Sequence, residues 1–129
     1  IICDHSERKI INLDRFEKKI QSAMKQSLKS YLPKLNKVTT FKNFLILQEN
    51  NTQQKLIAHC EETSKKTLKS VLKKRGDTTI LIGPEGDFSS DEINKSLRIG
   101  FAPISLGNSR LRTETAAVVA CHSVAFINE

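Results

Sequence analysis

The chain lacks tryptophan, has one tyrosine, and contains no long apolar run. A helix that crosses a bilayer needs about 20 consecutive apolar residues, and no segment approaches that length. No signal-peptide pattern is present at the amino end. With 129 residues, of which 38% are hydrophobic, the chain is predicted to form one soluble cytoplasmic domain over residues 1–129. It begins with Ile1 rather than Met, so we expect a fragment of a longer protein.

Cysteine is scarce, since Cys3, Cys60 and Cys121 lie far apart and form no C-x-x-C pair. An odd count in such a chain predicts reduced, buried thiols and a cytoplasmic protein rather than a disulfide framework. Two of the cysteines are adjacent to histidines, His59 and His122. Neighbouring residues on a strand point to opposite faces, and no ligand set at i,i+3 or i,i+4 spacing is present. No metal site is therefore expected.

Acidic residues are fewer than basic ones, 14 against 21, which gives a net charge of +7. Such an excess favours a polyanionic partner, nucleic acid first. The alternative is that the charge only keeps the surface soluble. The cations are concentrated on the polar face of a predicted helix, at Lys18, Lys19 and Lys25, and in the amphipathic stretch 64–76.

That helix is predicted to begin at an Asp14 N-cap, with Glu17 three residues later completing a capping box. It should end before Pro33, because the residue before a proline disfavours helical geometry. Apolar residues from Phe16 to Leu28 recur at helical spacing. We therefore expect one face of this helix to pack on the domain.

The rest of the chain alternates between strand and helix patterns. Strands are predicted at residues 1–3, 55–59, 79–82 and 102–107, while 41–47 is ambiguous between helix and strand. A Ser89–Glu92 capping box begins one helix, which ends at Gly100. Thr113 begins a final helix, rich in Ala and Val, that should be well buried. The alternation predicts an α/β fold with a mainly parallel sheet and helices on both faces.

Two of the predicted strands end in glycine loops. Residues 80–82 run into GPEGD (83–87), and residues 104–106 run into GNSRLRTET (107–115). Ligands of open α/β sheets bind at the carboxyl ends of strands, and glycine permits close approach to the main chain. Neither phosphate-binding glycine motif matches, and Glu85 and Asp87 would repel phosphate. The first loop therefore favours a neutral or cationic nucleoside-like ligand, although G-P-E-G can also be only a turn.

The second loop concentrates charge at the start of the final helix. Arg110, Arg112 and Glu114 fall within five residues. A positive cluster beside a helix N-terminus suits an anionic group. The alternative is an internal Arg–Glu ion pair, with Thr113 capping the helix.

Taken together, the segments LIGPEGDFSSDEI (81–93) and SLGNSRLRTETAAVVA (105–120) resemble the paired signatures of the ribosomal RNA small subunit methyltransferase E family. SAMKQSLKSYLP (22–33) is similar to an upstream helix of that family. The resemblance implies S-adenosylmethionine-dependent methylation of N3 of a uridine in 16S ribosomal RNA. It also implies a SPOUT-class fold with a trefoil knot, a homodimer, and a preceding PUA-like RNA-binding barrel that is not evident in this chain. Connection rules alone make a knot improbable.

The resemblance also assigns roles to individual residues. One group would bind the methyl donor: Leu47, Ile82, Gly83, Pro84, Glu85, Gly86, Leu106, Gly107, Arg110, Leu111 and Thr115. Glu114 would orient or accept the proton of the uracil imide, and Arg112 would stabilise charge or hold phosphate. Apart from the resemblance, the basic face that carries Lys18, Lys19 and Lys25 would add salt-dependent RNA affinity, and Arg112 would also contact RNA.

Two positions depart from the family pattern. Asp87 stands where G-P-E-G-G-F has its second adjacent glycine. Ser109 stands where the second motif usually has its first arginine, and Arg110 follows one residue later. The competing interpretation is a non-catalytic RNA-binding or ribosome-assembly module that retains the fold. Both ligand loops are nearly intact, which favours the enzyme.

Overall fold

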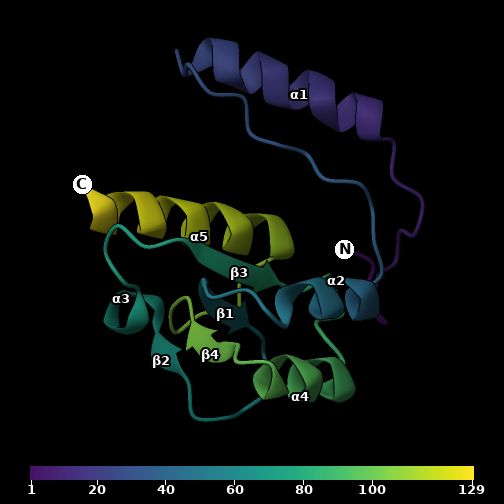
Figure 1. The fold of residues 1–129 in the computed structure, drawn as a ribbon, viewed down its shortest axis with the longest axis vertical. Helices are drawn as coiled ribbons and strands as arrows, with labels where there is room; N and C mark the ends of the chain where they lie inside the picture. Colours follow the sequence, from purple (N-terminus) through teal and green to yellow (C-terminus); the bar gives the residue numbers. More distant parts are fainter.

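Four parallel strands form the centre of the computed structural model, which describes residues 1–129 (Figure 1). The strands are β1 (Gln54–Ala58), β2 (Lys66–Thr67), β3 (Thr78–Ile82) and β4 (Ala102–Ser105), in the order β2-β4-β1-β3. Ala58 is in register with Ile82 on one side and with Ile104 on the other. The carboxyl ends of β1, β3 and β4 are therefore nearly level. The predicted parallel sheet is confirmed.

Helices lie on both faces of the sheet, as predicted (Figure 1). The five helices are α1 (Leu13–Gln26), α2 (Phe41–Gln48), α3 (Leu68–Val71), α4 (Ser90–Arg98) and α5 (Thr113–Asn128). α2 and α4 pack on the face that carries Ile57, while α3 packs on the face that carries Leu56. Adjacent strand residues point to opposite faces, so β1 supplies both cores and is buried on both sides. The ambiguous segment 41–47 is helical, in α2.

Several local predictions are confirmed around α4. The Ser89–Glu92 capping box is formed in both directions, and Gly100 has the positive φ of +94° that a helix C-terminal cap requires. Other expectations are wrong. Residues 1–3 form only an isolated bridge, Ile2 with Thr40. Cys3 is buried, but Cys60 and Cys121 are exposed free thiols.

Helix α1 departs most from expectation. Its N-cap is Asn12, whose side chain accepts a hydrogen bond of 3.1 Å from Arg15 N, so the Asp14 cap is wrong. The helix ends at Gln26, and Leu28 follows with a positive φ of +53°. None of its residues is buried, and Phe16 remains 47% exposed. The apolar face exists, but in this chain no other element covers it (Figure 1).

Helix α5 is also less buried than its composition predicts. Only Ala116 and Ala120 are buried, one turn apart, on the side that faces β3 and α3. Val118 and Phe126 are 68% and 69% exposed. A four-stranded sheet covers one stripe of a helix, so the remaining apolar faces stay in solvent. No helix is long and apolar enough to cross a membrane.

Candidate functional site

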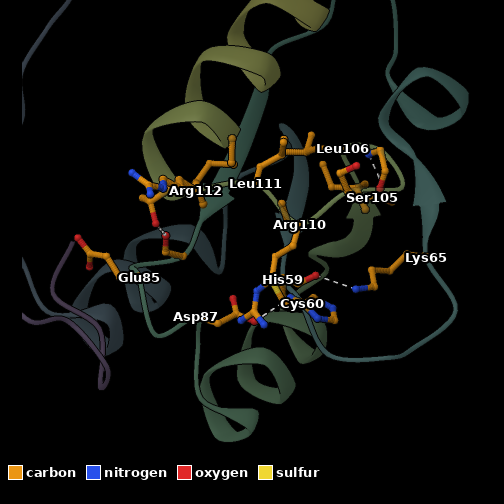
Figure 2. A pocket seen from close by; sticks show the side chains of 18 of the residues that line it. His59, Cys60, Lys65, Glu85, Asp87, Ser105, Leu106, Arg110, Leu111 and Arg112 are labelled. Carbon is orange, nitrogen blue, oxygen red and sulfur yellow. Dashed lines mark hydrogen bonds between the residues drawn. The ribbon is translucent and has the colours of Figure 1, made fainter.

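A pocket of about 930 Å³ opens at the carboxyl ends of β1, β3 and β4 (Figure 2). Its position follows from the strand register, because three strands end at the same edge and each continues into a loop. The loops after β3, β4 and β1 form three walls, and the start of α5 completes the lining. The two glycine loops singled out in the sequence therefore meet in space.

The first wall is the glycine loop after β3. Asp87 N donates to Pro84 O at 2.9 Å, which closes the loop into a tight turn. A Cβ atom at Gly83 would lie 2.9 Å from Asp87 Oδ1 and 3.3 Å from Phe88 Cδ2, so this buried position has no room for a side chain. Phe88 is itself held by Phe41, with ring centroids 5.5 Å apart. The turn is thus fixed to the core.

The N-terminal segment supports this loop from outside the pocket. Nδ1 of His5 lies 3.0 Å from Gly86 O, and a Cβ at Gly86 would meet His5 at 2.9 Å. Asp4 accepts from Ser89 Oγ at 2.7 Å. The buried Glu92 carboxylate accepts from Asp4 N at 3.0 Å and from Ser89 N at 2.9 Å. The loop is therefore preorganised by contacts far apart in sequence, as ligand-binding loops on rigid scaffolds are.

The second wall runs from the end of β4 to α5. Gly107 has a φ of +142°, with nothing within 4 Å of a Cβ built there. Thr113 Oγ1 donates to Gly83 O at 2.9 Å, which joins this wall to the first. The N-cap of α5 is Arg112, with no side-chain capping bond, so helix capping by Thr113 is wrong. The single ion pair of the molecule is Lys95–Asp91, so the alternative Arg–Glu pair is not formed.

Residues after β1 form the third wall. His59, Cys60, Glu62 and Lys65 line the pocket. Cys60 N donates to Asp87 Oδ2 at 2.7 Å, and Lys65 Nζ donates to His59 O at 2.7 Å (Figure 2). No residue of this wall was among the predicted donor-binding residues, which included Leu47 instead. The sequence does contain a signal for this wall, because the predicted strand at residues 55–59 (KLIAH) also ends at the carboxyl edge of the sheet.

Two titratable groups have shifted pKa values, His59 in the pocket lining and Cys3 in the hydrophobic core. Burial and then the charge of Lys65 lower the pKa of His59, against the smaller opposing effects of Asp87 and Glu61, so its ring is neutral at pH 7. Both ring nitrogens are buried without a hydrogen-bond partner. Burial, followed by the charge of Glu92, raises the pKa of Cys3 to about 11, which keeps that thiol un-ionised.

The pocket brings together most of the predicted site residues. Those that line it are Ile82, Gly83, Pro84, Glu85, Leu106, Gly107, Arg110, Leu111, Arg112 and Glu114. Gly86 and Thr115 are neighbours of lining residues but are not themselves part of the lining. Leu47 lies on α2, 72% exposed and outside the pocket, which is a correction. Lys18, Lys19 and Lys25 are exposed on α1, apart from the pocket. No group of three His, Cys, Asp or Glu residues could hold a metal ion.

Comparisons with known proteins agree with this geometry. A family model described as an RNA methyltransferase domain matches residues 1–125. The ribosomal RNA small subunit methyltransferase E of Buchnera aphidicola is 36% identical over 121 residues, which cover 91% of this chain and 47% of that protein. The chain thus spans about half the length of the curated relatives it matches.

Solved structures give the same result. A probable rRNA-methyltransferase from Porphyromonas gingivalis aligns with a TM-score of 0.87 and 39% identity over 98% of this chain and 54% of its own. A Legionella pneumophila methyltransferase, solved with its bound cofactor SAM, aligns with a TM-score of 0.80 and 31% identity over 97% of this chain and 52% of its own. The resemblance carried by the two glycine-loop motifs is confirmed.

Proposed function

The chain belongs to the RNA methyltransferase domain family, and we propose that it transfers a methyl group from S-adenosylmethionine to N3 of a uridine in 16S ribosomal RNA. The observation that supports this most directly is the shared pocket, in which both signature loops meet at the end of the sheet. The name of the Buchnera relative, a ribosomal RNA small subunit methyltransferase, supports small-subunit ribosomal RNA as the substrate, and the uridine N3 rests on the resemblance of the two motifs. A ribosomal RNA substrate would place the activity in the cytoplasm.

The pocket residues suit an adenosine-containing donor. Half-buried Ile82, Leu106 and Leu111 offer apolar surface, while exposed Gly107 offers main-chain groups. Ligand sites commonly combine apolar walls with a few oriented polar groups. When bound, the donor supplies an electrophilic methyl group on a positively charged sulfur. The chain's part is to hold it in a preformed cavity.

The acceptor would meet the donor at the start of α5. Arg112 and Glu114 line the pocket there and are exposed, so a large polyanion could reach them. A uracil N3 carries an imide proton that must leave as the methyl group arrives. In the proposal, Glu114 orients or accepts that proton. Arg112 stabilises the charge that develops on the uracil oxygens or holds a phosphate.

The family's trefoil knot is part of the proposal. β4 pairs with β1, yet the chain that leaves β4 continues to α5, which packs on β3 beyond β1. Residues 106–112 must therefore cross the carboxyl end of β1. A crossing at that point supports a threaded connection, and it places Gly107 where the chain needs little side-chain bulk.

A second copy of the chain would explain the uncovered apolar surface. The apolar residues of α1 and the exposed Val118 and Phe126 of α5 form more exposed apolar surface than is usual for helices that face solvent. We expect a homodimer in light scattering at micromolar concentration. Replacing both Val118 and Phe126 by Glu should give monomers that retain their circular dichroism spectrum, because neither side chain belongs to the core. A native chain that scatters as a monomer would contradict the dimer.

The lysines of α1 are expected to add RNA affinity without sequence specificity. Replacing Lys18, Lys19 and Lys25 by Glu should weaken binding to 16S rRNA fragments. The negative slope of log affinity against log salt concentration should become shallower by about two. Filter binding at several salt concentrations measures both quantities. Lys95→Glu is the matched control, because Lys95 is already paired with Asp91. Normal RNA binding by the triple variant at every salt concentration would leave these lysines only a solubilising role.

Calorimetric titration with S-adenosylmethionine and with its demethylated product tests the proposal directly. Binding of either ligand at a single site per chain supports the enzyme. RNA binding without binding of either ligand would favour the alternative, a non-catalytic RNA-binding or assembly module. Methylation of small ribosomal subunits, with the methylated nucleotide located by mass spectrometry, then tests the substrate.

A further inference from the structure

Asp87 has a left-handed backbone conformation, which is uncommon outside glycine and which Asp and Asn tolerate better than other residues. Its φ is +63°, in the left-handed region that glycine adopts without strain. The two other non-glycine residues with positive φ, Leu28 and Arg75, lie outside the pocket. Asp87 lines it. Strained backbone retained at a site of this kind calls for a compensating contact.

The side chain of Asp87 makes that contact. Its Oδ2 accepts the hydrogen bond from Cys60 N at 2.7 Å (Figure 2). Its Oδ1 lies beside Gly83, only 2.9 Å from the position of a Cβ there. Gly83 O in turn accepts from Thr113 Oγ1 at 2.9 Å. The series Cys60–Asp87–Gly83–Thr113 therefore connects all three walls of the pocket.

The wall after β1 makes few other hydrogen bonds near the pocket. Lys65 Nζ bonds to His59 O, and Ser90 Oγ donates to the Glu61 carboxylate. The Lys65 contact lies within the same segment, and the Glu61 contact joins one side chain to another on α4. The Cys60 contact is different, because it joins the main chain of this wall directly to the glycine loop after β3.

We infer that Asp87 is a positioning residue for donor binding: its carboxylate holds residues 59–62 against the glycine loop through Cys60 N, so that the pocket is formed before the ligand arrives. The donor's identity rests on the proposed function, whereas the contact itself does not. If the contact is lost, only a fraction of molecules keep the third wall in place. The apparent affinity for the donor is then multiplied by that fraction.

Two substitutions separate this role from backbone strain. Asp87→Gly relaxes the left-handed conformation but removes the acceptor. It is therefore expected to melt at the same or a higher temperature, yet to bind S-adenosylmethionine about tenfold more weakly. Asp87→Asn keeps an acceptor oxygen and tolerates positive φ. It should bind within about threefold of the native protein, since the hydrogen bond is retained without the charge.

Calorimetry with the donor and its demethylated product gives the affinities, and amide hydrogen exchange at Cys60 reports the contact itself. We expect faster exchange in Asp87→Gly and near-native exchange in Asp87→Asn. Native affinity in Asp87→Gly would overturn the inference, and so would an Asp87→Asn variant as weak as Asp87→Gly. If the native protein binds neither ligand, the proposed function fails. The contact is tested separately: equal exchange rates of the Cys60 amide in the native protein and both variants would show that Asp87 does not hold it.

Discussion

Glu114→Gln is expected to lower the methylation rate by about 100-fold while leaving affinity for S-adenosylmethionine within about twofold of the native value. Gln keeps the size of the side chain but cannot accept the imide proton. Glu114 lines the mouth of the pocket on the first turn of α5, where the acceptor base would enter. Single-turnover methylation of small ribosomal subunits and calorimetry with the donor measure the two quantities.

A matched control is available in the same pocket. Glu62 is an exposed lining carboxylate on the opposite wall, and Glu62→Gln should leave the rate nearly unchanged. Arg112→Ala should behave like Glu114→Gln if Arg112 stabilises developing charge, since both would then act on the transition state. Native turnover in Glu114→Gln would remove Glu114 from the catalytic assignment.

Much of the fold could be predicted because local and global signals agree. The apolar run at 80–82 ends in Gly83, and the structure has an edge strand, β3, that stops at Ile82. Ser89 and Glu92 predict a helix start, and both capping bonds are formed. Signals of this kind depend on residues close in sequence, so a single chain carries them completely.

What could not be predicted depends on long-range contacts. The apolar face of α1 indicates that this helix needs a covering surface, but not which surface, and in this chain nothing covers it. Similarly, the pattern of Ala and Val in α5 does not show that a four-stranded sheet buries only Ala116 and Ala120. Periodicity predicts a buried face only if a partner element is present.

The candidate site shows the same division. Both glycine loops were found from their motifs, but Leu47, which was assigned to donor binding, lies exposed on α2 outside the pocket. That assignment came from resemblance alone. The rule that ligands bind at the carboxyl ends of strands points instead to His59 and Cys60, which follow β1. The contact of Asp87 with Cys60, 27 residues apart, has no local signal.

Gly83→Val is expected to abolish binding of S-adenosylmethionine. A Cβ at this position would lie 2.9 Å from Asp87 Oδ1 and 3.3 Å from both Asp87 Cα and Phe88 Cδ2. Because one of these neighbours is backbone and another is an aromatic ring in the core, the loop must move rather than a flexible side chain. Overpacking of this kind costs about 1–3 kcal/mol of stability. The same movement displaces the wall that Thr113 and Asp87 hold together, so affinity should fall by about 100-fold or more.

Two variants distinguish loss of the site from loss of the fold. Gly76→Val places its Cβ 3.6 Å from Lys73, an ordinary contact outside the pocket, and should bind the donor normally. Gly107→Ala meets no atom within 4 Å but forces alanine to a φ of +142°. It should therefore remain folded by circular dichroism while donor affinity falls about tenfold, because the main chain of the second wall shifts to relieve the strain. Native affinity in both Gly83→Val and Gly107→Ala would show that the donor does not bind between these loops.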